Sequence, residues 1–163
     1  MKVEQLMTRV FRTVAPDETL AAAARVMWEE DCGCVPVAAS TDDGARRLVG
    51  MVTDRDACMA AWTQGRPLAE IPVAAAMAHD VATCGPGDTV AGALAVMRTR
   101  QLRRIPVVDV HEALVGILSL ADVAREAARE DGRGAREVRF DDVGATLAAI
   151  VKPHAPARDV VAA

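Results

Sequence analysis

The sequence predicts a mixed α+β protein made of two β-α-β-β-α repeats that pack about an approximate twofold axis, with one further helix at the C-terminus. The first observation behind this prediction is an internal repeat, because residues of the first half recur in the same order in the second half. The second is that each copy carries an apolar stripe of helical period followed by two short aliphatic runs. The third is length: in a chain of 163 residues, each copy is marginally stable by itself, whereas the pair can share a core.

The two copies span about residues 7–62 and 77–128. Matched residues keep their order along both copies: Met7 with Met77, Thr13 with Thr83, Pro16 with Pro86, Thr19 with Thr89, Met27 with Met97, Pro36-Val37 with Pro106-Val107, and Leu48-Val49-Gly50 with Leu114-Val115-Gly116. We therefore expect a first repeat at 1–62, a connector at 63–76, a second repeat at 77–128, and a charged segment with an amphipathic helix at 129–163.

Each repeat is expected to begin with a short strand, at 11–14 and at 81–84, and to continue into a helix. Apolar residues at helical spacing mark that helix: Leu20, Ala23, Ala24 and Met27 in the first copy, and Val90, Ala93, Leu94 and Met97 in the second. The preceding PDET and PGDT sequences supply the polar residues that suit a helix N-terminus.

Two aliphatic runs follow the helix in each copy and predict an antiparallel strand pair, at 35–37 with 48–53 and at 105–108 with 114–119. A proline in the first run indicates a strand end or an edge, and the unbroken apolar character of the second run predicts burial on both faces. A second helix is expected from about Asp54 and from about Leu120, with apolar residues at Ala57, Cys58, Ala61 and Trp62, matched by Val123, Ala124, Ala127 and Ala128.

The C-terminal segment predicts one more amphipathic helix, which ends near Pro153. Its apolar residues are Phe140, Val143, Leu147, Ile150 and Val151. Such a helix either packs back on the two repeats or mediates self-association.

Composition excludes several classes of function. Aromatic residues make up only 2% of the chain and the net charge is −4, so a surface that stacks bases or follows a phosphate backbone is not expected. No apolar run approaches the roughly 20 residues that cross a bilayer, and the N-terminus lacks a signal-peptide core. We therefore expect a cytoplasmic protein with reduced cysteines, without nucleic-acid or membrane partners.

The sequence contains no motif that predicts catalysis. A phosphate-binding P-loop, a dinucleotide-binding glycine pattern, a zinc-protease helix and a serine-nucleophile elbow are all absent, so we do not expect an enzyme. The spacing of Cys32, Cys34, Cys58 and Cys84 does not match a zinc site, and no metal or other cofactor is expected.

One polar pattern recurs at the start of the second helix of each copy: Thr53 with Asp56, and Ser119 with Asp122. A hydroxyl followed by an acid three residues later is a common helix cap, and capping alone explains the pattern. The same position also offers free backbone N–H groups and the positive end of a helix dipole, where a phosphate binds well. A carboxylate one turn further can accept hydrogen bonds from both ribose hydroxyls, so the pair suits a nucleotide.

The ordered set MTRVFRTVAPDETLAAAARVMWEEDCGCVPV…LVGMVTDRDA, repeated as MAHDVATCGPGDTVAGALAVMRTRQLRRIPVVDV…LVGILSLADVA, resembles a tandem cystathionine-β-synthase (CBS) domain pair, also called a Bateman module. The resemblance covers about 7–128. It implies two units that form a disc whose clefts bind adenosine-containing ligands such as AMP, ADP, ATP or S-adenosylmethionine. It also implies dimerisation of modules into a four-unit ring.

The resemblance implies roles for individual residues. The family's [ST]-x-x-D motif falls on Thr53 with Asp56 and on Ser119 with Asp122, where the hydroxyl meets phosphate and the acid meets ribose. Residues near the first strands are implied to line the adenine slot: Thr13, Val14, Val35, Thr83, Cys84 and Ile105. Three arginines of the two sites lack a basic counterpart in the other copy and either neutralise phosphate or remain solvated: Arg55, Arg103 and Arg104. The two clefts are therefore expected to bind with different affinities.

The leading hypothesis is a stand-alone regulatory module, which the resemblance implies is a homodimer, and a separate effector protein that responds to its ligand-dependent packing. The alternative is a ligand-independent interaction protein that dimerises through its helices and tail, with both hydroxyl–acid pairs serving only as caps. A third hypothesis is a thiol-based redox or metal sensor that uses Cys32 and Cys34.

Overall fold

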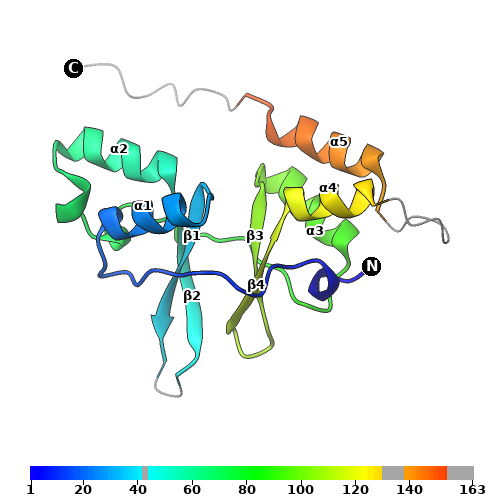
Figure 1. Ribbon diagram of the computed structural model, residues 1–163, viewed down its shortest axis with the longest axis horizontal. Helices are drawn as coiled ribbons and strands as arrows, with labels where there is room; N and C mark the ends of the chain where they lie inside the picture. The colour runs from blue at the N-terminus through cyan, green and yellow to red at the C-terminus, as the bar shows by residue number, and fades with distance from the viewer. Residues whose placement is uncertain (42–43, 130–137, 154–163) are drawn as a thin grey trace.

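The computed structural model describes residues 1–41, 44–129 and 138–153, and these form two similar halves that lie side by side (Figure 1). The first half contains α1 (Leu20–Glu29), β1 (Cys34–Ser40), β2 (Arg46–Thr53) and α2 (Asp54–Gln64). The second contains α3 (Val90–Arg100), β3 (Arg104–Val108), β4 (Leu114–Ser119) and α4 (Leu120–Ala128), and is followed by α5 (Phe140–Ile150). The predicted mixed α+β class and the duplicated element order are confirmed.

Each half contains one antiparallel hairpin, β1 with β2 and β3 with β4. Both hairpins have an irregularity at the same place, between Val37 and Ala38 and between Val107 and Val108. The strands predicted at 11–14 and 81–84 are reduced to single bridging residues: Val14 pairs in parallel with Val37, and Cys84 with Val107. The Val14 amide donates to the Pro36 carbonyl and the Val14 carbonyl accepts from the Ala38 amide, which is the hydrogen-bond pattern of one parallel bridge.

Burial on both faces belongs to the first strand of each hairpin and not, as expected, to the second. β1 is buried from Cys34 to Ala38, whereas burial alternates along β4 and the first residues of β2 are exposed. Val35 and Val37 lie in the core of the first half, while Cys34 and Pro36 line cavities between the halves. The first strand therefore lies between a core and a cleft, which explains its continuous burial.

The halves exchange their N-terminal arms. Residues 1–8 cross to the second half, where Thr8 and Ile117 exchange backbone hydrogen bonds of 2.8 and 3.0 Å (Figure 1). In the reciprocal contact, Met51 and Ala78 exchange bonds of 3.0 and 2.8 Å. Because the two contacts join equivalent positions of the repeats, they support the predicted approximate twofold relation between the halves.

The segment expected to be a connector contributes to a core. Two short 3-10 helices, Leu68–Glu70 and Val73–Ala75, lie within it, and Ile71 and Val73 are fully buried in the core of the first half. In the same way, Val3 and Met7 belong to the core of the second half. Each repeat therefore completes its core with residues that precede the other repeat in sequence.

Gly50 and Gly116 explain why the LVG sequence recurs. The crossing arm passes so close to the strand that a Cβ atom at Gly50 would lie 2.7 Å from the Met77 sulfur and 3.0 Å from the Ala78 carbonyl oxygen. At Gly116 the same atom would lie 2.7 Å from the Met7 sulfur. Glycine is required here by close approach of the exchanged arms.

Helix α5 packs on α3 and α4 of its own chain (Figure 1). Arg98 donates a hydrogen bond of 3.1 Å to the Thr146 hydroxyl, and Gln101 donates to the Ala149 and Lys152 carbonyls, each at 3.1 Å. Ile150 joins the core of the second half. The sequence allowed this helix either to pack back on the repeats or to mediate self-association, and in the structure it packs on the second repeat of its own chain.

The first half has no such cover on its helices within the described residues. Cys58 and Trp62, which were expected on the apolar face of the second helix, are exposed, whereas α2 buries Ala57, as expected, together with Ala60. None of the helices in the described part of the chain combines the length and the apolar character that a bilayer crossing requires.

Candidate functional site

Two clefts lie between the halves, and each is built from both repeats. The Thr53 cleft, with a volume of about 480 Å³, combines the β2–α2 junction at Thr53–Asp56 with residues 80–82 and 101–104 of the second repeat. The Ser119 cleft, of about 310 Å³, combines the β4–α4 junction at Ser119 and Asp122 with residues 10–12 and 30–36 of the first repeat. Equivalent positions therefore line the two clefts, as the approximate twofold relation requires.

The two hydroxyl–acid pairs form capping boxes of the same geometry. The Thr53 hydroxyl accepts a hydrogen bond from the Asp56 amide at 3.1 Å, while one Asp56 carboxylate oxygen, Oδ2, accepts from the Thr53 amide at 2.9 Å and from its hydroxyl at 2.7 Å. Ser119 and Asp122 repeat these contacts at 3.1, 2.8 and 2.6 Å. Capping is therefore real at both positions, and it uses Oδ2 of each acid and leaves Oδ1 outside the box.

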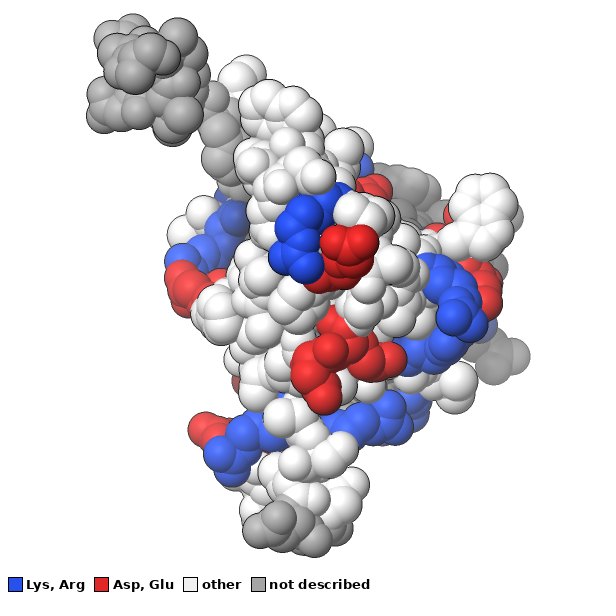
Figure 2. Space-filling view, turned by 90° about the vertical axis from the view of Figure 1, so that its left-hand side faces the viewer, with Lys and Arg blue, Asp and Glu red and all other residues white. Residues whose placement is uncertain are grey.

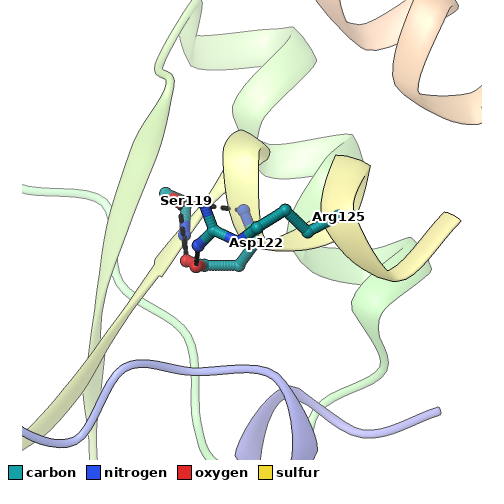
Figure 3. Close-up of polar contacts among 3 residues, drawn as sticks. All are labelled: Ser119, Asp122 and Arg125. Carbon is teal, nitrogen blue, oxygen red and sulfur yellow. Dashed lines mark hydrogen bonds and ion pairs between the residues drawn. The ribbon is translucent and has the colours of Figure 1, made fainter. Parts of the chain in front are cut away.

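The outer oxygen distinguishes the two acids. Arg125, one turn along α4, forms an ion pair with Asp122 Oδ1, and the Asp122 side chain is only 10% exposed (Figure 3). The equivalent position in α2 holds Met59, which cannot form such a pair. Among the described residues, Oδ1 of Asp56 has no hydrogen-bond donor, so this oxygen is available to a ligand in the Thr53 cleft.

The basic residues are also distributed unequally between the two clefts. The Thr53 cleft is lined by Arg55, Arg103 and Arg104, and in the described part of the chain none of these guanidinium groups forms an ion pair with a carboxylate. In the Ser119 cleft, Arg12 is paired with Glu29, and Arg125 with Asp122. The Thr53 cleft therefore holds three such arginines, against Arg104 alone among the described residues of the Ser119 cleft, while the acids Asp54, Asp56 and Asp80 also line the Thr53 cleft.

Several residues implied to line the adenine slot lie elsewhere. Val14, Cys84 and Ile105 are buried in the cores and line neither cleft, whereas Val35 does line the Ser119 cleft. The Thr13 hydroxyl accepts a hydrogen bond of 3.3 Å from Arg46, and Thr83 lies in a separate hollow.

In place of the residues predicted at Val14 and Cys84, the clefts are lined by residues two to four positions earlier in the chain, at 10–12 and 80–82. The sequence places them in the loop before each bridging residue, where no hydroxyl or charge pattern marks them. Only the exchange of arms brings them against the hydroxyl–acid pair of the other repeat, and the recurring LVG glycines were the one signal of that close approach.

Cys34 and Arg104 occupy equivalent positions at the start of β1 and β3, and both line both clefts. Burial raises the pKa of the Cys34 thiol, and the neighbouring Arg104 guanidinium opposes that effect. Burial, assisted by Asp88, raises the pKa of Cys84 to about 11. These two thiols are therefore neutral at neutral pH and poorly suited to redox or metal chemistry.

The described residues contain no group of three or more His, Cys, Asp or Glu side chains placed to hold a metal ion. The Cys32 thiol instead donates a hydrogen bond of 3.3 Å to the Cys34 carbonyl oxygen. Among the described residues, Cys32 and Cys34 therefore do not belong to a cluster that could bind a metal ion.

Comparison with known proteins finds the CBS domain model twice, at residues 3–62 and 70–129. The second match begins at 70, within the segment that packs on the first half. The chain is 35% identical over 122 residues to the CBS domain-containing protein YhcV of Bacillus subtilis, which covers 75% of this chain and 82% of YhcV. It is 37% identical over 113 residues to Hypoxic response protein 1 of Mycobacterium tuberculosis, which covers 69% of this chain and 75% of that protein.

Solved structures share the fold. The crystal structure of Hypoxic Response Protein I with two coordinated zinc ions matches with a TM-score of 0.68 and 32% identity, covering 77% of this chain and 98% of that one. The CBS domain pair of protein MJ0100, in complex with 5′-methylthioadenosine and S-adenosyl-L-methionine, matches with a TM-score of 0.65 and 22% identity, covering 77% and 94%. The second likeness concerns the fold alone.

Proposed function

The chain belongs to the CBS domain family as a pair of repeats, and from this premise we propose that it is a regulatory module that binds an adenosine-containing ligand in the clefts between its halves. The ligands that fit are AMP, ADP, ATP and S-adenosylmethionine. The module acts in the cytoplasm and catalyses no reaction itself. A separate effector protein reads the ligand-dependent change in packing between the halves, which requires that the ligand bind one packing more tightly than the other.

The observation that carries this proposal is the Thr53 cleft. Its volume of about 480 Å³ lies in the range of small-molecule sites. Its walls combine apolar side chains such as Met51, Val81 and Leu102 with polar and charged ones, which include arginines and the acids Asp54, Asp56 and Asp80. The apolar walls suit an adenine ring. The unpaired oxygen of Asp56 suits ribose hydroxyls, and Arg55 with Arg103 suits phosphate.

The Ser119 cleft is the weaker of the two in this proposal. A ribose that approaches Asp122 Oδ1 must first displace Arg125, so part of the interaction energy is lost to a broken ion pair. Support for adenosine as the common element comes from the MJ0100 pair, whose two bound ligands both contain adenosine. The zinc ions of Hypoxic Response Protein I are not part of the proposal, because the described residues of this chain offer no comparable ligand cluster.

Isothermal titration calorimetry with AMP, ATP and S-adenosylmethionine tests the proposal. A charge-assisted contact contributes about 1.5–3 kcal/mol, so Asp56→Ala should weaken the tighter site by tenfold or more. Asp122→Ala should weaken the other site, and Arg125→Met, which copies the first repeat, should strengthen it. Asp88→Ala is the matched control, because Asp88 also caps a local turn, at 2.8 Å from the Gly85 amide, but lines neither cleft. Unchanged binding in both Asp56→Ala and Asp122→Ala would contradict the ribose role.

A specific observation also favours self-association. Trp28 and Trp62 are 88% and 75% exposed on the helices of the first half, and Met59 is 43% exposed beside them. A groove of about 680 Å³ is lined by Trp28, by small or apolar residues such as Ala24 and Ala57, and by the two acids Asp31 and Asp54. Figure 2 views this end of the molecule and shows uncharged surface with acidic and basic side chains near its centre and around its margins. Exposed tryptophans beside an apolar groove are typical of interfaces.

We propose that the face formed by α1 and α2 binds the same face of a second copy. Trp28 and the groove lie on the same face, which is the arrangement that a twofold interface between identical surfaces requires. Trp62→Glu should shift the chain toward monomer in sedimentation velocity, whereas Val110→Glu, at a 92% exposed turn position, should not. A Trp62→Glu monomer that still binds ATP would separate dimerisation from ligand binding. Equal behaviour of the two variants would contradict this interface.

A further inference from the structure

Arg104 lies where the two clefts meet. Its side chain lines both the Thr53 cleft and the Ser119 cleft, and it is half-buried. Cys34, the residue at the equivalent position of the first repeat, also lines both. Equivalent residues that each contribute to both cavities must sit near the axis that relates the halves.

Only one member of this central pair carries a charge. Arg104 has no carboxylate partner among the described residues, whereas the buried Cys34 thiol is neutral at neutral pH. The duplication thus places a single guanidinium between two cavities. A guanidinium binds one phosphate group best when it donates two parallel hydrogen bonds to it, so it cannot serve both clefts equally at once.

Two anionic ligands would also repel each other across this centre. The screening length at physiological ionic strength is about 8 Å for exposed charges, and partly buried charges are screened less. Because the Thr53 cleft also has Arg55 and Arg103, a phosphate there can engage Arg104 with additional support. Within the described part of the chain, the Ser119 cleft offers a phosphate Arg12 and Arg125 besides Arg104, and both are paired with acids.

We propose that Arg104 couples the two clefts negatively. A phosphorylated ligand in the Thr53 cleft binds the Arg104 guanidinium and thereby lowers the affinity of the Ser119 cleft for a second phosphorylated ligand. This coupling rests on the proposed function and adds regulation to it. Coupling between sites in proteins is typically about 5- to 150-fold in affinity, and it is reciprocal. An adenosine-containing ligand without phosphate should bind the two clefts independently.

The experiment compares the Ser119 cleft with its neighbour filled and empty. Calorimetry with ATP on the full chain gives the affinity of the weaker site in the native protein. The same titration of Asp56→Ala gives the affinity of the Ser119 cleft when the Thr53 cleft binds ATP at least tenfold more weakly and is no longer filled first. Negative coupling predicts that ATP binds the Ser119 cleft at least about fivefold more tightly in Asp56→Ala than at the second step of the native protein. Adenosine should show no such difference.

Variants of Arg104 identify the residue responsible. In Arg104→Gln, the ATP affinity of the Ser119 cleft should differ by less than about twofold between a filled and an empty Thr53 cleft. Arg104→Lys keeps the charge and should retain most of the native difference in affinity. Arg103→Gln is the control, because Arg103 lines only the Thr53 cleft. Thermal unfolding verifies that each variant is folded, and Asp56→Asn replaces Asp56→Ala if the latter is not.

Two results would contradict the proposed coupling, and both can be distinguished from a result that contradicts the proposed function. Equal ATP affinity of the Ser119 cleft with the Thr53 cleft filled or empty would eliminate coupling while leaving nucleotide binding intact. A difference that persists unchanged in Arg104→Gln would assign coupling to another residue. Failure of ATP, AMP, adenosine and S-adenosylmethionine to bind the native chain at all would refute the proposed function, and the coupling with it.

Discussion

The two halves share their elements but differ in what covers them. In the second half, α5 lies on α3 and α4, and Arg98 of α3 donates a hydrogen bond to Thr146 of that helix. In the first half, the position of Arg98 is taken by Trp28, which is 88% exposed. Duplication has therefore preserved the backbone, while Arg98 and Gln101, which bond to α5, stand where the open face has Trp28 and Asp31.

The clefts differ in the same way. Met59 and Arg125 occupy equivalent positions in α2 and α4, and of these two only Arg125 forms an ion pair with the acid of its own capping box. Gly33 and Cys34 are matched by Arg103 and Arg104, so only the second repeat supplies central positive charge. Small differences at matched positions, on a scaffold that keeps the geometry constant, are enough to make the two sites chemically distinct.

The largest expected effect concerns the cover on the second half. Ile150→Ala removes a buried side chain between α5 and the core, and such truncations cost about 2–5 kcal/mol of unfolding free energy. Trp62→Ala, on the open face of the first half, should change the free energy of unfolding of the monomer by no more than about 0.5 kcal/mol. Urea denaturation at low protein concentration measures both. Equal losses would remove the distinction between a covered and an open half.

An intermediate effect is expected where the arms cross the strands. Gly50→Ala and Gly116→Ala each force a methyl group against the crossing arm and should cost about 1–3 kcal/mol. The loss should be larger at Gly50, where the backbone oxygen lies at 3.0 Å, than at Gly116, where it lies at 3.2 Å. Gly144→Ala in α5, where no atom lies within 4 Å, is the control and should stabilise by about 0.5–1 kcal/mol. Thermal unfolding ranks the three variants, and the opposite order at Gly50 and Gly116 would contradict the comparison.

The smallest effect is expected from the buried thiols at alkaline pH. The pKa of Cys84 is about 11 in the folded chain against an ordinary value of 9.0, so the unfolded chain loses this proton first as pH rises. The contribution of Cys84 is therefore fully present below pH 9.0 and declines up to about pH 11. Cys84→Ala should flatten this decline in a series of urea denaturations. Cys34→Ala should flatten it less, because Arg104 opposes the upward shift of the Cys34 pKa. The reverse ranking would show that Arg104 does not influence the thiol.

Local pattern was sufficient for most elements. Apolar residues at helical spacing predicted α1 and α3, and the aliphatic runs predicted both hairpins. Pattern was misleading where burial depends on a distant segment. Cys58 and Trp62 fit an apolar helix face, yet no described element covers them, and the second strands looked buried on both faces although the first strands are.

By itself, the sequence determined the duplication, the α+β class and the two hydroxyl–acid caps, because each depends on residues close together in the chain or on direct comparison of the copies. The tertiary structure alone decided which loops line the clefts and that Arg104 lies between both cavities. The physical reason is the exchange of N-terminal arms, which brings together residues from opposite repeats that no local periodicity connects.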